Sequence, residues 1–334
     1  MGRKPMKRII SAVLMMAVLF CLSACGQRMP ESSETAQVEQ SGQTNHQTEQ
    51  TTPAEQGQEN DHNETDSTEP AKIFNSWDEV PVNKYQEKTI EVDYNGQTIW
   101  GIAYIPETGQ EKFPLVICSH GLGGSYTSCM EYAELLASHG FATYCFDFRG
   151  GGGSHSDGKL TEMSLITEAT DVQTIIAAAK NWDFVDPEKI ILLGESQGGA
   201  ASAIAAARSK DDVNGLILCY PALLVHDAVH EQFDSLDEVP DSFFFNWLTV
   251  GRPYVADVWD YDVYSEIGNY SKPVLLMHGD RDGIVPSSYA ERAAEVYPDV
   301  EYHVISSGGH GFYGAALDDA FLYILQYLQR ISII

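Results

Sequence analysis

A serine between two glycines is the residue in this sequence best suited to nucleophilic chemistry. Residues 194–198 read Gly-Glu-Ser-Gln-Gly, with Ser196 at the centre, and follow the apolar run 189–193. A serine on a sharp turn from a strand into a helix has a strained backbone, and side chains on its neighbours would clash there, which accounts for the glycines. The turn would present the hydroxyl at a helix N-terminus, where partial positive charge favours a developing anion. The pattern therefore predicts an exposed nucleophile at Ser196.

A serine hydroxyl needs a base, and the base needs a carboxylate that orients it. Asp282 lies in a loop directly after the apolar run 273–278, and His310 lies in a Gly-rich loop after the run 301–305. The order Ser196, Asp282, His310 is one of the chain orders in which such triads occur. Asp280 stays open as an alternative for the orienting acid.

The other histidines and the acidic stretch 257–262 do not predict a metal site. His226 and His230 are four residues apart, but the zinc-protease pattern has Glu after the first histidine, and this sequence has Asp227. Residues 257–262 lack the spacing and the glycine of an EF-hand. We therefore expect no metal. Three further histidines, at strand ends or within a strand, are expected to be structural: His120, His278 and His303.

Short apolar runs that alternate with helical patterns must position these residues. Strands buried on both faces appear as continuous apolar runs, and alternation with helices indicates a mostly parallel sheet with helices on both faces. The sequence thus predicts an α/β fold, preceded by an antiparallel hairpin that turns at Asn95-Gly96. The predicted strands are 115–119, 142–148, 189–194, 216–220, 273–278 and 301–305, and the predicted helices are 163–180, 198–208, 287–296 and 318–330.

A long insertion interrupts this alternation. About 50 residues, 222–271, stand where one crossover helix would be enough, and an insertion of this length is usually functional. We expect a cap over the site, while packing on the sheet edge stays open as an alternative. The aromatic cluster 243–247 would either line a substrate pocket or form the core of the cap.

Together these motifs resemble a known family. Residues from about 85 to the C-terminus resemble the α/β-hydrolase superfamily, and within it the cinnamoyl/feruloyl esterase-like serine esterases, with kinship to the serine aminopeptidase-like group. Besides the three motifs above, the resemblance rests on His-Gly-Leu-Gly-Gly at 120–124 and Asp-Phe-Arg-Gly at 147–150. The histidine that follows the second motif in the family is replaced here by Gly151, in a run of four glycines.

The resemblance implies roles for the matching residues. Ser196 would be the nucleophile, His310 the base and Asp282 the orienting acid, while the backbone amides of Leu122 and Gln197 would form the oxyanion hole. It extends weakly into the insertion at 239–241 and 251–254. There, polar residues of the esterase group contact the phenolic end of the acyl group, and a rough alignment brings Asp227 and Tyr254 near that place.

The function implied is cleavage of a small carboxylic ester, hydroxycinnamoyl or short acyl, without a metal or organic cofactor. Two alternatives stay open: a serine aminopeptidase-like peptidase with the same triad, and a non-catalytic surface binding protein on the same fold. The sequence indicates no particular oligomeric state.

The N-terminal residues predict export and attachment to a membrane. Four basic residues precede the apolar run 9–22, which is short for a spanning helix and typical of a signal peptide. Leu-Ser-Ala-Cys at 22–25 resembles the lipobox of bacterial lipoproteins, which implies removal of residues 1–24 and a lipid on Cys25. An ordinary signal peptide is the alternative. Residues 25–72 are rich in Gln, Glu and Thr and are expected to form a disordered acidic tether to the hydrolase domain, 73–334.

Charge and cysteine usage restrict the partners further. The 334 residues include 48 acidic and 20 basic ones, a net charge of −28. Such a chain is unsuited to nucleic acid and would be repelled by anionic lipid, so the lipid on Cys25 would have to hold it at the membrane. Three of the cysteines Cys118, Cys129, Cys145 and Cys219 lie in apolar runs, which indicates small buried hydrophobes rather than a disulfide framework.

Overall fold

The computed structural model describes residues 82–153 and 155–331. These residues fall in one compact unit, Lys72–Ile334. The predicted signal peptide 1–24, the tether 25–72 and the lipid attachment site Cys25 lie outside the described residues. No helix in the described ranges is long and apolar enough to cross a bilayer.

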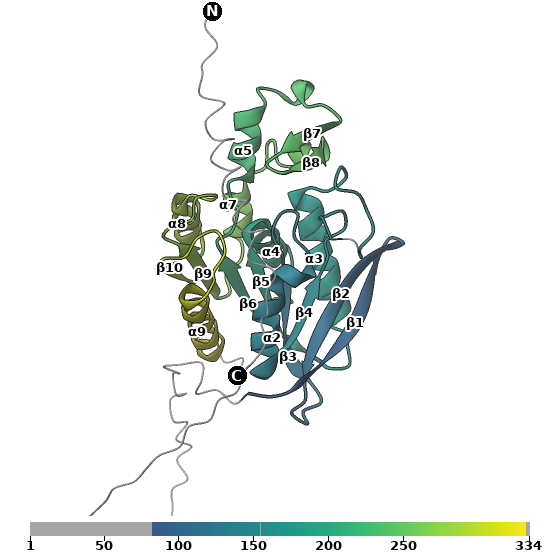
Figure 1. Ribbon diagram of the computed structural model, residues 1–334, viewed down its shortest axis with the longest axis vertical. Helices are drawn as coiled ribbons and strands as arrows, with labels where there is room; N and C mark the ends of the chain where they lie inside the picture. Colours follow the sequence, from purple (N-terminus) through teal and green to yellow (C-terminus); the bar gives the residue numbers. More distant parts are fainter. Residues whose placement is uncertain (1–81, 154, 332–334) are drawn as a thin grey trace, which may run out of the picture. The chain divides into compact units, whose positions relative to one another are not determined.

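An eight-stranded sheet forms the centre of this unit (Figure 1). Its strand order is β1-β2-β4-β3-β5-β6-β9-β10; β2 pairs antiparallel with β1 and β4, and the other pairs are parallel. The predicted α/β class with a mostly parallel sheet and an N-terminal hairpin is therefore confirmed. The strands are β1 Tyr85–Tyr94, β2 Gln97–Pro106, β3 Phe113–Ser119, β4 Ala142–Phe146, β5 Val185–Glu195, β6 Gly215–Cys219, β9 Val274–Gly279 and β10 Val300–Ile305.

The sequence patterns of the strands follow from their burial. β4, β6 and β9 are buried at every residue, so they can be apolar throughout. β1, at the sheet edge, is mostly exposed. The turn from β1 to β2 places Asn95 at φ 53° and Gly96 at φ 82°, which asparagine and glycine adopt more easily than other residues.

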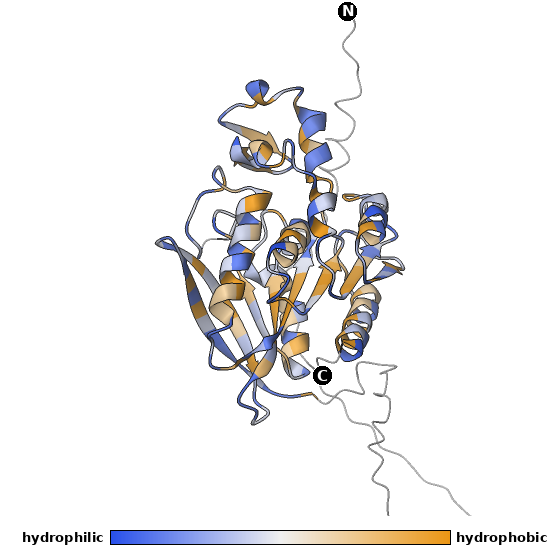
Figure 2. Ribbon diagram, turned by 180° about the vertical axis from the view of Figure 1, so that it is seen from behind, coloured by the Kyte–Doolittle hydropathy of each residue, from blue (hydrophilic) through white to orange (hydrophobic). Residues whose placement is uncertain are grey.

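Helices cover both faces of the sheet and enclose two apolar cores. Helices α3 Leu165–Ala179, α4 Ser196–Arg208 and α8 Ser287–Val296 pack with the insertion around one core. Helices α2 Met130–Ser138 and α9 Ala315–Arg330 cover the other. Figure 2 shows the hydrophobic residues concentrated on the central strands between these layers. Helix α2 was not predicted, although its buried residues, among them Tyr132 and Leu136, lie on one face.

The insertion between β6 and β9 forms a small substructure beyond one end of the sheet (Figure 1). It contains a separate two-stranded hairpin, which turns at Asn246 with φ 53°. Its elements are α5 Val225–Gln232, β7 Ser242–Phe245, β8 Leu248–Gly251, α6 Pro253–Ala256 and α7 Val263–Ile267.

Candidate active site

Ser196 stands at the junction of β5 and α4. The strand ends at Glu195 and the helix begins at Ser196, whose φ is 51°. A Cβ on Gly194 would come within 2.5 Å of the carbonyl oxygen of Gly198, and one on Gly198 within 2.3 Å of that of His120. Neither position can therefore hold a side chain, and this close packing explains the Gly-x-Ser-x-Gly pattern.

The structure brings Ser196, at the start of α4, together with His310 and Asp282, which lie in two separate loops. His310 Nε2 lies 2.8 Å from Ser196 Oγ, and His310 Nδ1 lies 2.8 Å from Asp282 Oδ2. The other oxygen of the carboxylate, Asp282 Oδ1, accepts hydrogen bonds from the amides of Ile284 and Val285 at 2.8 and 2.9 Å. The nucleophile, base and acid proposed from the sequence thus form one hydrogen-bonded chain.

The surroundings of Asp282 keep its carboxyl ionised. Burial opposes the charge, but the hydrogen bond from His310 and those from the two backbone amides outweigh it and lower the pKa of Asp282. The alternative acid, Asp280, is exposed, and its backbone amide donates to Ile305. The geometry favours Asp282 over Asp280.

Two of the remaining histidines hold loops around the site. His120 lies 2.8 Å through Nδ1 from the carbonyl oxygen of Gly121, and its Nε2 accepts from the amide of Phe148 at 3.3 Å. His278 Nε2 lies 2.9 Å from the carbonyl oxygen of Val285, within the loop that holds Asp282. Burial lowers the pKa of both rings and keeps them neutral. His303, on β10, stacks on Tyr323.

The loop 120–124 lies against the nucleophile. A Cβ on Gly121 would be 3.1 Å from the Cβ of Ser196, and Gly123 turns the loop with φ 71°. Leu122 lies in this loop, and Gln197 directly follows the serine in the first turn of α4. The role of their amides in binding an oxyanion stays a prediction.

The hairpin of the insertion contacts this loop. A Cβ on Gly123 would be 2.7 Å from Leu248 Cδ1 and 3.2 Å from Trp247 Nε1. The aromatic cluster 243–247 therefore has two roles. Phe245 packs on Tyr254, with ring centroids 4.9 Å apart, inside the insertion. Phe244 is exposed, and Trp247 lies partly exposed beside the loop.

The run of four glycines also has a packing reason. A Cβ on Gly152 would be 2.8 Å from the Cα of Gly123, and one on Gly153 would be 2.2 Å from Asp147 Cγ. The run therefore lets the chain approach both the 120–124 loop and Asp147 more closely than side chains would allow.

The side chain of Gln197 connects the insertion to the domain core. Gln197 Nε2 donates to Glu168 Oε2 at 2.9 Å, and the hydroxyl of Tyr254 donates to Gln197 Oε1 at 2.6 Å. Glu168 is buried, which raises its pKa to about 8. The sequence analysis missed Glu168. A signal was present, because this charged residue occupies an inward position of α3 between Leu165 and Ala169.

The two residues proposed for substrate binding lie in different surroundings. Tyr254 is fully buried and contacts Gln197. Asp227 lies in a groove of about 490 Å³ between α5, α7 and α8, where it accepts a hydrogen bond from the hydroxyl of Tyr289 at 2.8 Å. The hydrogen bond from His226 lowers the pKa of Asp227. Their contact with substrate stays a prediction.

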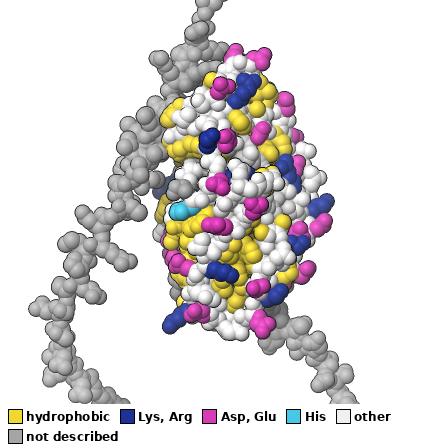
Figure 3. Space-filling view, turned by 90° about the vertical axis from the view of Figure 1, so that its right-hand side faces the viewer, with side chains coloured by type: hydrophobic (Ala, Val, Ile, Leu, Met, Phe, Trp, Pro, Cys, Tyr) yellow, Lys and Arg dark blue, Asp and Glu magenta, His cyan; other side chains and the backbone are white. Residues whose placement is uncertain are grey.

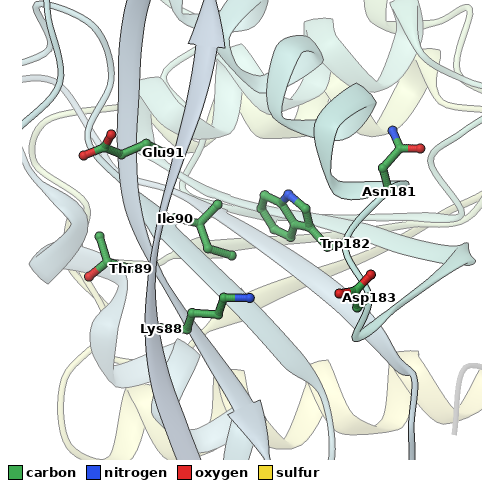
Figure 4. Close-up of a pocket in the computed structure, with 7 residues that line it drawn as sticks. All are labelled: Lys88, Thr89, Ile90, Glu91, Asn181, Trp182 and Asp183. Carbon is green, nitrogen blue, oxygen red and sulfur yellow. The ribbon is translucent and has the colours of Figure 1, made fainter.

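Another hollow lies away from all these residues. It lies between β1 and the turn after α3 (Figure 4). Its volume is about 350 Å³. Its walls include Ile90 and Trp182, and it contains none of the predicted site residues.

No metal-binding group stands out in the described residues, and no basic patch stands out on the face drawn in Figure 3. In residues 82–153 and 155–331, no three His, Cys, Asp or Glu side chains form a group that could hold a metal ion. His230 of the histidine pair instead contacts the carbonyl oxygen of Trp259 at 2.8 Å. The face drawn in Figure 3 shows acidic side chains spread widely and basic ones that do not gather into a patch.

The sequence has recognisable relatives. Residues 110–255 match the model of a family described as serine aminopeptidase, S33. The uncharacterized protein Rv2307c of Mycobacterium tuberculosis is 30% identical over 208 residues, which cover 62% of this chain and 66% of that protein. The chain thus spans slightly less than two thirds of that relative. The quorum-quenching protein AidA of Acinetobacter baumannii is 21% identical over 75% of this chain and 97% of its own length.

Solved structures share the architecture. Est1E from Butyrivibrio proteoclasticus, in a structure with ferulic acid bound, has a TM-score of 0.65 and 26% identity over 73% of this chain and 99% of its own. The α/β hydrolase GrgF from Penicillium has a TM-score of 0.61 at 15% identity, over 74% of this chain and 99% of its own. The second likeness concerns the fold alone, and it agrees with the first.

Proposed function

We propose that this chain, which has the α/β-hydrolase fold, is a serine hydrolase that cleaves carboxylic esters through an acyl-enzyme. The observation that carries the proposal is the hydrogen-bonded chain from Ser196 through His310 to Asp282, with 2.8 Å at each step. A nucleophile, a base within hydrogen-bond reach and a third group that orients the base are the parts that acyl transfer requires. The matches to a serine aminopeptidase family model and to Est1E support a serine hydrolase.

The proposal gives each proton transfer to a named atom, and the two 2.8 Å distances support that choice. Ser196 Oγ attacks the ester carbonyl and passes its proton to His310 Nε2, while Asp282 Oδ2 accepts the hydrogen bond from Nδ1 and stabilises the imidazolium. His310 then gives the proton to the leaving alcohol. A water molecule, deprotonated by the same nitrogen, releases the acid from the serine.

The negative oxygen of the tetrahedral intermediate needs donors beside the serine. We assign this role to the backbone amides of Leu122 and Gln197, because the 120–124 loop lies against Ser196 and Gln197 begins α4. The side chain of Gln197 is held by Glu168 and Tyr254, which keeps this turn in place.

An ester is favoured over a peptide as substrate. Est1E, whose structure has ferulic acid bound, is matched over 99% of its length at 26% identity. A hydroxycinnamoyl or short acyl ester is therefore the proposed substrate, with Asp227 and Tyr254 as candidate contacts. Cleavage of a peptide is the second candidate, and the match of residues 110–255 to the serine aminopeptidase model favours it.

A substrate panel separates these functions. We expect the full chain to hydrolyse methyl ferulate and p-nitrophenyl acetate or butyrate with kcat/KM about 10²-fold above that for aminoacyl p-nitroanilides. Ser196→Ala protein, prepared identically, corrects for spontaneous hydrolysis. Faster cleavage of the anilides would instead support the peptidase. No cleavage, together with no labelling by a fluorophosphonate, would leave a binding protein on the same fold.

We further propose that a lipid on Cys25 tethers the protein to the outer side of a bacterial membrane, on the strength of the Leu-Ser-Ala-Cys motif at 22–25. Replacement Cys25→Ser should move the full chain from the membrane fraction of an expressing bacterium to the soluble fraction, because the acidic domain has no electrostatic attraction to anionic lipid. The matched control is Cys21→Ser, which leaves the motif intact and should stay with the membrane. Equal fractionation of Cys25→Ser and the unchanged chain would argue against the tether.

A further inference from the structure

A carboxyl group that the mechanism above does not use lies next to the nucleophile. Glu195 is the last residue of β5 and is buried. Its Oε1 accepts a hydrogen bond from the hydroxyl of Tyr220, and its Oε2 accepts one from Cys129 Sγ at 3.4 Å. Both partners are donors, and two donors suit a carboxylate, which can only accept.

Tyr220 connects this carboxyl to the base. It follows β6 with φ 40°, a conformation unusual for a residue with a side chain, and its amide donates to the carbonyl oxygen of Met277 at 2.7 Å. The ring of Tyr220 meets the ring of His310 edge to face, with centroids 5.0 Å apart and planes at 60°. Tyr220 thus contacts both residues: its hydroxyl donates a hydrogen bond to Glu195, and its ring packs against the ring of His310.

Glu195 lacks an ordinary counterion. In the described part of the chain it forms no ion pair with Lys or Arg, and the positive group that acts on it electrostatically is His310. Burial raises the pKa of Glu195 above its usual value and outweighs the hydrogen bonds from Tyr220 and Cys129 and the charge of His310, which lower it, while the carboxyl of Glu131 raises it further. The titratable groups that interact electrostatically with Glu195 are Cys129, Glu131, Tyr132, Cys145, Cys219, Tyr220 and His310.

His310 therefore has several charged or titratable neighbours. Asp282 accepts its Nδ1 hydrogen bond, and His278, buried and neutral, lies 3.4 Å from the same carboxylate. Glu195 is an acid from another element, at the end of β5. An imidazolium formed at His310 would thus interact with two carboxylates: Asp282, which is hydrogen-bonded to it, and Glu195, which is hydrogen-bonded to Tyr220.

We propose that Glu195 is a positioning residue for His310: it fixes the imidazole through Tyr220, and its carboxylate stabilises the imidazolium that forms when Ser196 gives up its proton. The catalytic part of this inference rests on the proposed function. The effect of Glu195 on the protonation of His310 does not, because it is present without substrate. A residue that only filled space or held the turn of Tyr220 would not change the protonation of His310.

The direct test measures the protonation of His310 in the absence of turnover. The imidazole of His310 is titrated by NMR in the full chain with Ser196→Ala, and its resonance is the one that His310→Ala removes. Adding Glu195→Gln should lower the pKa of His310 by about half to one unit, because the imidazolium loses a nearby negative charge. The matched control is Glu131→Gln, an exposed carboxyl two residues from Cys129, which should leave the titration unchanged.

Kinetics in the Ser196 protein give the second readout. With an ester substrate, Glu195→Gln should move the acid limb of the kcat/KM profile to lower pH by the same amount and lower kcat about tenfold with KM unchanged. If Glu195→Gln does not fold, Tyr220→Phe takes its place. This change keeps the ring that packs against His310 but removes a donor to Glu195, and should lower the pKa of His310 by a smaller amount.

The outcomes separate this inference from the proposed function. An unchanged His310 titration in folded Glu195→Gln, or in Tyr220→Phe if the first variant is unfolded, would overturn the inference whether or not esters are cleaved. A shifted titration in a protein that cleaves no ester would overturn only the proposed function.

Discussion

Replacement of Ser196 by alanine is expected to lower kcat for ester hydrolysis by about 10⁶-fold and to abolish labelling by a fluorophosphonate. The reason is that Ser196 Oγ is the atom 2.8 Å from His310 Nε2, and without it neither the acyl-enzyme nor the phosphonylated enzyme can form. The fold should persist, because alanine can take the place of serine at the start of α4 without new contacts. Initial rates and labelling with a fluorescent probe check both effects.

The matched control for this change is Ser209→Ala. Ser209 caps the other end of α4, so the control removes a hydroxyl from the same helix without touching the site. It should keep the activity and the labelling of the unchanged chain. Undiminished labelling of Ser196→Ala would mean that the nucleophile is another residue, and the mechanism proposed here would be wrong.

Replacement of Asp282 by asparagine is expected to lower kcat by about 10⁴-fold. Asp282 Oδ2 accepts the hydrogen bond from His310 Nδ1, and an amide in its place would favour the wrong tautomer of the ring and would not stabilise the imidazolium. The hydrogen bonds from Ile284 and Val285 to Oδ1 can be accepted by the amide oxygen, so the loop should keep its shape. Rates with one ester, measured between about pH 5 and 9, check this prediction.

The neighbouring acid provides the control. Asp280 is two residues away and exposed, so Asp280→Asn should keep kcat within about threefold of the unchanged chain. A loss of activity in Asp280→Asn with none in Asp282→Asn would reverse the choice of orienting acid. Circular dichroism of both variants shows that any difference arises at the site and not from unfolding.

Much of the fold was predictable because a buried strand appears in the sequence as a continuous run of apolar residues. β4, β6 and β9 are mostly apolar, since helices cover both of their faces, and each was predicted from that run. Helix α2 was missed because it has only nine residues and follows Cys129, whose side chain makes no capping hydrogen bond. The internal elements of the insertion were not predicted because they are short, between four and eight residues for α5, β7, β8, α6 and α7.

The residues of the candidate site also include some that the sequence predicted and some that it did not. Ser196, Asp282 and His310 were found because each follows an apolar strand, in a chain order known for such triads. Glu195 and Glu168 were not found, since an acidic residue in the sequence is most often exposed. Their burial depends on residues distant in sequence, Tyr220 for the first and Gln197 for the second.

The sequence alone determined the fold class, and it predicted the candidate nucleophile and the order of the candidate catalytic groups, because these depend on local patterns: apolar runs, glycines at a strained turn, and polar residues at strand ends. Only the tertiary structure decided which acid is hydrogen-bonded to His310, how the insertion contacts the 120–124 loop, and which carboxyl groups are buried. The physical reason is that parallel strands are joined by long crossovers. Residues that are in contact at the carboxyl ends of the strands can therefore be far apart in the sequence, as Ser196 and His310 are, at a separation of 114 positions.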